Sequence, residues 1–252
     1  MRFRQIMALG LVLLGPMAAQ AGPLVAAASN VQGALDEIIA GYALETGVAV
    51  RVSYGSTGNL VRQIREGAPF DLFLSADEES VEGLVDLGLT AGAAQVYAIG
   101  QLALLVPKDG AIEADPTLEG LQAALAAGRV TRFAIANPEH APYGMRAREA
   151  LEHEGLWEAL QPHLVLGENV AQAAQFVTSG NAEGGIVALS VALTPAVVAR
   201  TDHAVLPADW HAPLTQGMVV LPRGGADAQA FAAWLRGDAA RAVWAAHGYG
   251  VP

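Results

Sequence analysis

The chain has 252 residues, no cysteine, and 14 Lys and Arg against 25 Asp and Glu. The lack of cysteine excludes disulfides, thiolate metal sites, cysteine nucleophiles and a lipid-modified N-terminal cysteine. The acidic balance argues against a nucleic acid or an anionic membrane surface as the partner, although it leaves open a small site formed by local dipoles.

An export signal is predicted over residues 1–21. Arg2 and Arg4 precede an apolar run over 6–14, and Ala19-Gln20-Ala21 forms a small-residue cleavage site. The apolar run is too short for a membrane anchor. Without the two arginines the balance is 12 basic against 25 acidic residues, a net charge of −13. We therefore expect a soluble periplasmic protein, cleaved after Ala21, with room for one domain or two lobes of about 100 residues.

Short apolar segments alternate with amphipathic helices from Leu24 onward, a pattern typical of an α/β protein with largely parallel sheets. Helices with apolar residues at three- and four-residue spacing follow the first three strands, and Thr46-Gly47 ends the first helix. The predicted strands in this half of the chain cover 24–28, 48–54, 70–76 and 101–107.

The second half continues the alternation of strands with helices or turns. A helix is predicted over 145–153, and the chain closes with a helical stretch over 226–244. No repeat and no low-complexity linker occurs, so strands rather than a flexible tether are expected to join any two lobes. The predicted strands of this half cover 132–138, 164–170, 184–190 and 215–222.

Three predicted loops place small or hydroxyl-bearing residues between the end of a strand and the start of a helix. Ser29-Asn30 follows the first strand, the residues at 55–58 follow the second, and Tyr143-Gly144 ends the loop after 132–138. Helix starts carry unpaired N–H groups and partial positive charge, so they attract anions without Lys or Arg. Each loop alone is typical of helix capping. Three of them at the carboxyl ends of strands indicate a small-anion site.

Metal and hydrolytic chemistry have weaker support in the sequence. The six histidines form no HExxH motif and no pair at i, i+4, so we expect no metal site, and His140 to brace its loop. Ser29 and Ser56 both lack the GxSxG pattern of a serine hydrolase. The acidic run at 77–79 opens a helix, where carboxylates complement the dipole. An enzyme is therefore not expected.

Five segments, in one order, cover nearly all of the chain after residue 21. They resemble the periplasmic molybdate-binding proteins of ABC importers, most specifically in GAPFDLFLSAD and NPEHAPYG. The segments are LVAAASNVQGALDEI, YGSTGNLVRQIREGAPFDLFLSAD, NPEHAPYGMRAREAL, GENVAQAAQFV and GNAEGGIVALS.

The resemblance implies a type II periplasmic-binding-protein fold, in which two α/β lobes and two crossover segments enclose a ligand cleft. Lobe I would comprise 22–101 and 216–252, and lobe II would comprise 102–215. The protein would be a monomer without cofactor that delivers its oxyanion to a membrane permease and the associated ATPase.

The family binds molybdate or tungstate through neutral hydrogen-bond donors, with no metal cation and no positive side chain. By motif, Ser29 would supply a hydroxyl and a backbone N–H, and Asn30 a donor beside it. Thr57 stands where the family has a second hydroxyl, a role that its neighbour Ser56 could share. Val170 of GENV would add a backbone N–H from the second lobe.

One position departs from part of the family. Some members place a ligand tyrosine after GIV, where this chain has Ala188. The chain instead resembles the members whose phenol comes from the NPEHAPYG loop, here Tyr143. Gly58 and Gly144 flank the proposed ligands and are second-rank candidates.

The donor set suits an ion that carries no proton. Molybdate accepts hydrogen bonds and donates none, whereas phosphate keeps a proton near neutrality and would favour an acceptor such as Asp. Sulfate or another tetrahedral oxyanion is the alternative ligand, and a serine hydrolase is the alternative class. The signal peptide and the lack of a helix-turn-helix argue against the effector domain of a transcriptional regulator.

Overall fold

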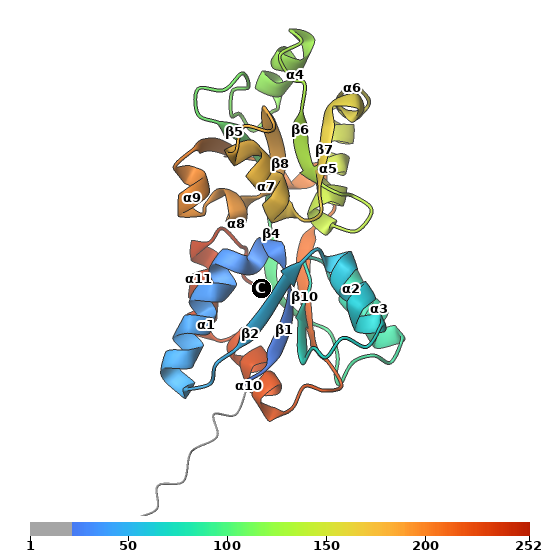
Figure 1. The fold of residues 1–252 in the computed structure, drawn as a ribbon, viewed down its shortest axis with the longest axis vertical. Coiled ribbons are helices and arrows are strands. Elements are labelled where there is room, and N and C mark those ends of the chain that lie inside the picture. The colour runs from blue at the N-terminus through green and yellow to red at the C-terminus, as the bar shows by residue number, and fades with distance from the viewer. Residues whose placement is uncertain (1–21) are drawn as a thin grey trace, which may run out of the picture.

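The computed structural model describes residues 22–252, so the predicted signal peptide lies outside the described residues. Two five-stranded sheets, each flanked by helices, follow one another along the long axis of the molecule (Figure 1). Within the described part, no helix has the length and apolar character needed to span a membrane.

The first sheet has the strand order β2-β1-β3-β10-β4. The strands β1, β2 and β3 are parallel, whereas β10 runs antiparallel to both β3 and β4. The strands are β1 (Leu24–Ala28), β2 (Arg51–Gly55), β3 (Leu72–Leu74), β4 (Gln95–Gly100) and β10 (Leu214–Val220).

Helices cover both faces of this sheet because its strands alternate their side chains between two apolar layers. Val25 and Ala27 of β1 pack in the layer that includes α1, α10 and α11, whereas Ala26 packs in the layer that includes α2 and α3. The helices are α1 (Gln32–Thr46), α2 (Thr57–Arg65), α3 (Glu79–Asp86), α10 (Ala226–Trp234) and α11 (Asp238–Ala246).

The second sheet has the strand order β7-β6-β8-β5-β9. The strands β6, β7 and β8 are parallel, and β5 runs antiparallel to β8 and β9. The strands are β5 (Leu102–Pro107), β6 (Phe133–Ala136), β7 (Leu164–Gly167), β8 (Gly184–Ala188) and β9 (Thr201–Val205).

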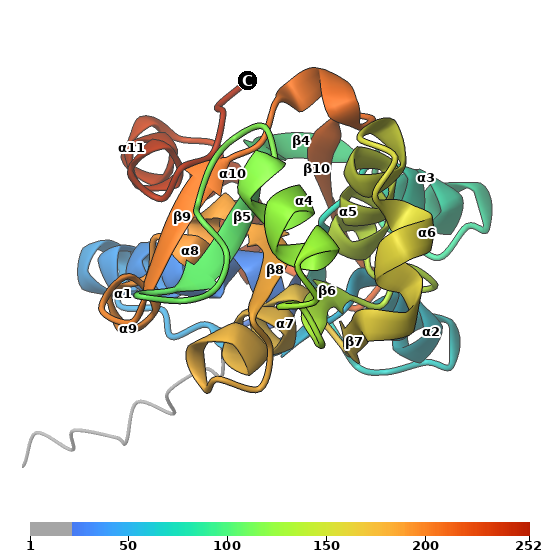
Figure 2. The same cartoon turned by 90° about the horizontal axis from the view of Figure 1, so that it is seen from above.

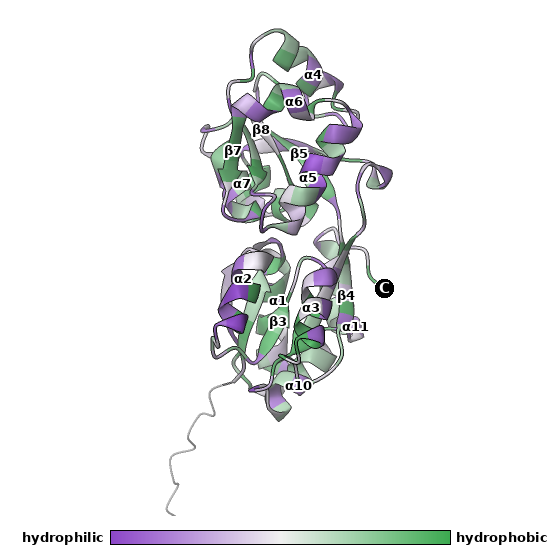
Figure 3. Ribbon diagram, turned by 90° about the vertical axis from the view of Figure 1, so that its right-hand side faces the viewer, coloured by the Kyte–Doolittle hydropathy of each residue, from purple (hydrophilic) through white to green (hydrophobic). Residues whose placement is uncertain are grey.

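The helices α5 and α7 both pack on β6 and β8, and Figure 2 shows them on opposite sides of these strands. The strands of both sheets are coloured mainly as hydrophobic, whereas the helices carry both hydrophobic and hydrophilic residues (Figure 3). The helices are α4 (Glu119–Ala126), α5 (Pro142–His153), α6 (Trp157–Leu160), α7 (Val170–Thr178), α8 (Leu189–Ala192) and α9 (Pro195–Val198), with 3₁₀ turns η1 (Ser29–Val31), η2 (Gln161–His163) and η3 (Ala208–Trp210).

The prediction of largely parallel sheets is wrong, because both sheets are mixed. The chain passes from β4 to β5 through the single residue Gln101 and returns from β9 into β10. As a result, β10 runs antiparallel to its neighbour β3 in the first sheet, and β5 runs antiparallel to its neighbour β8 in the second. The edge strands β4 and β9 and the helix α4 escaped prediction, and the last helical stretch is divided in two at Gly237.

The helix α5 begins three residues before its predicted start. Pro142 occupies the first turn, a position that proline favours because its fixed φ suits a helix and it lacks an N–H to leave unpaired. Tyr143 and Gly144 therefore belong to the helix and not to the loop. Gly144 lets the helix approach β6 closely, since a Cβ there would lie 2.2 Å from the carbonyl oxygen of Ala136.

We expect Gly144→Ala to lower the free energy of unfolding by about 1–3 kcal/mol, as for overpacked sites, because the added methyl meets backbone. Gly83 provides the matched control, since it lies in α3 and a Cβ added there would have nothing within 4 Å. Gly83→Ala should raise stability by up to about 1 kcal/mol through helix propensity. Urea unfolding of both variants measures the difference, and equal effects would contradict the close contact.

Candidate functional site

The three loops singled out in the sequence meet at one small pocket between the two sheets. Ser29 and Thr57 border it from the first sheet, and Tyr143 and Val170 border it from the second. The volume of the pocket that the centre of a water-sized group can occupy is about 10 Å³. This is roughly the volume needed to hold one such group. This size suits a small ion. The other lining residues are Ala28, Asn30, Gly55, Ser56, Ala76, Ala141, Pro142 and Asn169.

Hydrogen-bond donors dominate the polar lining of the pocket. Thr57, Tyr143 and Val170 lie in the first turns of α2, α5 and α7, and their backbone N–H groups have no acceptor within residues 22–252. No charged side chain is among the described residues that line the pocket. Because helix starts carry partial positive charge, the site attracts an anion through dipoles alone.

The capping interpretation of the three loops is wrong. Ser56 is the N-cap residue of α2, yet its side chain forms no capping hydrogen bond. Alanines occupy the N-cap positions of η1 and α5. Side-chain capping occurs instead at Asn169, whose Oδ1 accepts from the N–H of Gln172 at 3.1 Å. The hydroxyls of Ser29 and Ser56 are therefore not consumed by the helices that they precede.

His140 braces its loop as predicted, and it does so across the two sheets. Its Nδ1 lies 3.0 Å from Ser56 Oγ, and its carbonyl oxygen accepts from the N–H of Gly58 at 2.9 Å. A second contact of the same kind joins Asn59 Nδ2 to Glu168 Oε2 at 3.3 Å. These bonds hold the loop after β2 against the loops that precede α5 and α7.

The two second-rank glycines do not border the pocket. The N–H of Gly58 is used by His140, and that of Gly144 donates to Ala141 O at 2.9 Å. Thr57, by contrast, borders the pocket with its hydroxyl fixed, because Thr57 Oγ1 accepts from the N–H of Ala76 at 3.0 Å. Its side chain is 1% exposed.

Asn30 borders the pocket, and its side-chain amide is used inside the protein. Nδ2 donates to Gln216 Oε1 and to Tyr249 Oη, each at 2.9 Å. Its Oδ1 is buried and has no hydrogen-bond partner. The amide hydrogens of Asn30 are therefore not free for a ligand.

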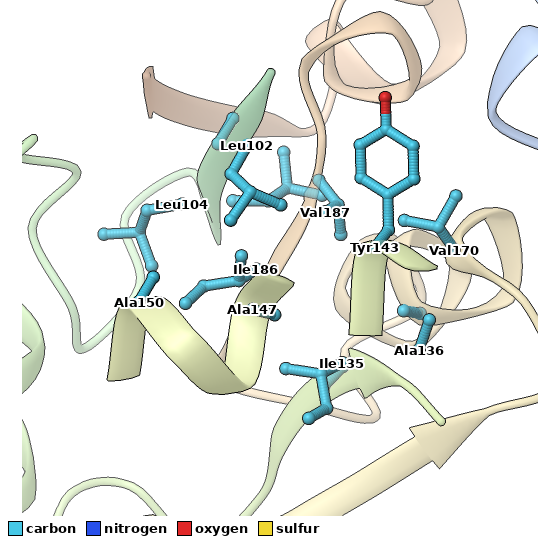
Figure 4. Close-up of a cluster of buried hydrophobic side chains, with 14 of the residues drawn as sticks. Leu102, Leu104, Ile135, Ala136, Tyr143, Ala147, Ala150, Val170, Ile186 and Val187 are labelled. Atoms are coloured by element: carbon cyan, nitrogen blue, oxygen red, sulfur yellow. The ribbon is translucent and has the colours of Figure 1, made fainter. Parts of the chain in front are cut away.

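Tyr143 stands out of the apolar core of the second lobe with its hydroxyl turned away from that core (Figure 4). The hydroxyl oxygen accepts from Gln216 Nε2 at 3.1 Å, so its proton remains available to another acceptor. Burial raises the pKa of the Tyr143 phenol well above its usual value, with the nearby phenol of Tyr249 adding to the effect. The group therefore stays protonated, as a donor must.

Three residues of this buried network, Tyr97, Gln216 and Tyr249, escaped the sequence analysis. Tyr97 Oη lies 2.9 Å from Ser75 O, and Tyr249 Oη donates to Asn30 O at 2.8 Å. Burial also raises the pKa of both phenols. The one available signal was Gln216 itself, a lone amide inside the apolar strand TQGMVV.

Two α/β lobes that are joined by crossover strands and enclose a pocket for one small solute have the architecture of a periplasmic solute-binding protein. Residues 23–250 match the family model of bacterial extracellular solute-binding proteins, and the chain belongs to this family. The predicted family resemblance and fold class are thereby confirmed.

Relatives with curated names cover almost the whole chain. The molybdate-binding protein ModA of Azotobacter vinelandii is 38% identical over 98% of this chain and 97% of its own length. The molybdate-binding protein ModA of Rhodobacter capsulatus is 35% identical over 88% of this chain and 85% of its own length. The solved structure of the Azotobacter vinelandii periplasmic molybdate-binding protein matches with a TM-score of 0.82 and 34% identity, covering 91% of this chain and 99% of that one.

We expect the three network phenols to resist ionisation until the protein unfolds. Because their folded pKa values are raised, their contribution to stability is complete below pH of about 10, the ordinary tyrosine pKa, and is lost as the pH rises above it. Absorbance of tyrosinate, with and without guanidinium, measures the titration. Full ionisation near pH 10 in the folded protein would contradict the burial of these hydroxyls.

Proposed function

We propose that this protein captures molybdate, and tungstate in the same way, and delivers it to the membrane permease and ATPase of an ABC importer. The observation that carries the proposal is the pocket itself, which offers uncharged donors from both lobes to a space for one small ion. The molybdate-binding relatives, which match this chain along almost its entire length, support it.

The chemistry of the ion matches the chemistry of the pocket. Molybdate at neutral pH is a dianion without protons, so every oxygen accepts hydrogen bonds and none donates. Each hydrogen bond to a charged group contributes about 1.5–3 kcal/mol, and several such bonds offset the cost of removing the ion from water. The helix starts add favourable partial charge without a competing cation.

The proposed ligands are those that the family motif indicates. Ser29 donates through its hydroxyl and backbone N–H, Thr57 and Val170 through the N–H groups at their helix starts, and Tyr143 through its phenol. Asn30 donates through its backbone N–H while its amide holds the present orientation. Ser56 contributes only when its hydroxyl proton is not engaged by His140.

Capture and release follow from the two-lobe arrangement. We assign residues 22–101 and 216–252 to lobe I and residues 102–215 to lobe II, with the ligand between them. Because ligands come from both lobes, the bound ion favours the closed form, which the permease then recognises. The exported protein acts as a monomer in the periplasm after cleavage behind Ala21.

Hydrolysis is a second activity for which the described residues offer a contact. Ser56 Oγ and His140 Nδ1 lie within hydrogen-bond reach, as a nucleophile and its base do. The pair spans the two lobes, however, and Ser56 lacks the GxSxG pattern of a serine nucleophile. The relatives are binding proteins, and we propose binding without turnover; hydrolysis of a generic ester, lost in Ser56→Ala, would overturn this.

Calorimetry on ion-stripped protein tests the ligand. We expect tight binding of molybdate and tungstate and much weaker binding of sulfate and phosphate in the same preparation. Sulfate has the same charge and the same acceptor oxygens, so it is the strictest competitor. Tight binding of sulfate with no heat from molybdate would reject the proposed ligand and leave an oxyanion-binding protein.

Tyr143→Phe should weaken molybdate binding by about 1.5–3 kcal/mol, the value of one hydrogen bond to a charged group. Tyr54→Phe is the matched control, because Tyr54 Oη donates to Asp36 away from the pocket. Ala188→Ser, at the position where other family members place the tyrosine, should matter much less. If Tyr143→Phe binds molybdate as tightly as the wild type, the segment that carries Tyr143 only shapes the cleft and does not bind the ion.

A further inference from the structure

Gln216 does not line the pocket, but it forms hydrogen bonds with residues that do. It lies in β10 with 0% of its surface exposed, beside an irregularity in the pairing of β10 with β4 between Gln216 and Gly217. A buried amide destabilises the fold unless its polar atoms are paired. Gln216 meets this condition through side chains on three other elements, two of which border the pocket.

Each end of the Gln216 amide contacts one of the proposed ligand residues. Oε1 accepts from Asn30 Nδ2 at 2.9 Å and from Tyr97 Oη at 2.8 Å, whereas Nε2 donates to Tyr143 Oη at 3.1 Å. The contact with Asn30 links it to lobe I, and the contact with Tyr143 links it to lobe II. One side chain therefore determines the hydrogen-bonding state of two pocket residues.

We infer that Gln216 is a positioning residue that keeps the proton of Tyr143 available to the bound oxyanion. The inference rests on the proposed function and deepens it. While Nε2 donates to Tyr143, the phenol proton is free for the ligand, and Asn30 keeps its amide hydrogens for Gln216 and Tyr249.

The consequence is selectivity against ions that carry a proton. A hydrogen phosphate ion needs an acceptor, and the oxygen of Tyr143, which already accepts from Gln216 Nε2, does not serve as one. Without Gln216, the hydroxyl of Tyr143 and the amide of Asn30 turn independently, so that either group can present an oxygen lone pair to the ligand.

The test compares molybdate with hydrogen phosphate at pH 8, where both ions carry two negative charges and only phosphate carries a proton. Gln216→Met keeps the length of the side chain and removes all three hydrogen bonds. We expect molybdate affinity to fall at least tenfold, and the ratio of molybdate to hydrogen phosphate affinity to fall with it. Gln101→Met is the matched control, because Gln101 Nε2 donates to Gly248 O at 2.8 Å near the same crossover.

A double-mutant cycle separates positioning from a general loss of structure. If Gln216 acts through Tyr143, the loss of molybdate affinity in Gln216→Met plus Tyr143→Phe is smaller than the product of the two single losses. Gln216→Glu serves as a second variant if Gln216→Met does not fold. Its carboxylate draws the phenol proton away from the pocket, so the same change in the ion ratio is expected.

The outcomes distinguish the inference from the proposed function. An unchanged ion ratio in a folded Gln216 variant, or independent effects in the cycle, would overturn the positioning role while molybdate binding by the wild type stands. Wild-type protein that binds no molybdate would overturn the proposed function, and the inference with it.

Discussion

Unpaired backbone N–H groups at the starts of helices are the constraint on which this structure depends. Three such groups, at Thr57, Tyr143 and Val170, border one buried space that is walled by both sheets. Inside a protein such groups lack the hydrogen-bond partners that water would provide. In this structure all three border the same pocket. The anion that we propose as ligand would pair with all of them at once and so complete the hydrogen bonding of the fold.

The mixed strand directions place the remaining parts of the site. Because β4 and β10 are neighbours in the first sheet, Gly100 and Gln216 lie side by side where the chain passes between the lobes. The hydroxyl of Tyr143 reaches this point, and a Cβ on Gly100 would lie 2.1 Å from it. The phenol thus extends from the second sheet to the crossover, where the Gln216 amide donates to its oxygen.

The sequence predicted those parts of the structure that depend on local patterns. Buried parallel strands and the loops at their ends carry strong signals, and the motif residues Ser29, Thr57, Tyr143 and Val170 do meet at one pocket. The edge strands β4 and β9 carry mixed polar and apolar residues and were missed. The orientation of the Asn30 amide was unpredictable, because it depends on Gln216, which lies 186 residues further along the chain.

The two sides of the pocket are closed by bonds of different kinds. On the crossover side the chain itself passes between the lobes, and the network around Gln216 is fully buried. On the opposite rim the closure consists of the contacts that His140 and Glu168 make with the loop after β2, and the side chain of Glu168 is 71% exposed. Water competes for the rim bonds and does not reach the others. If the ion binds in this pocket, as we propose, the rim contacts are the ones that open first and would set its residence time.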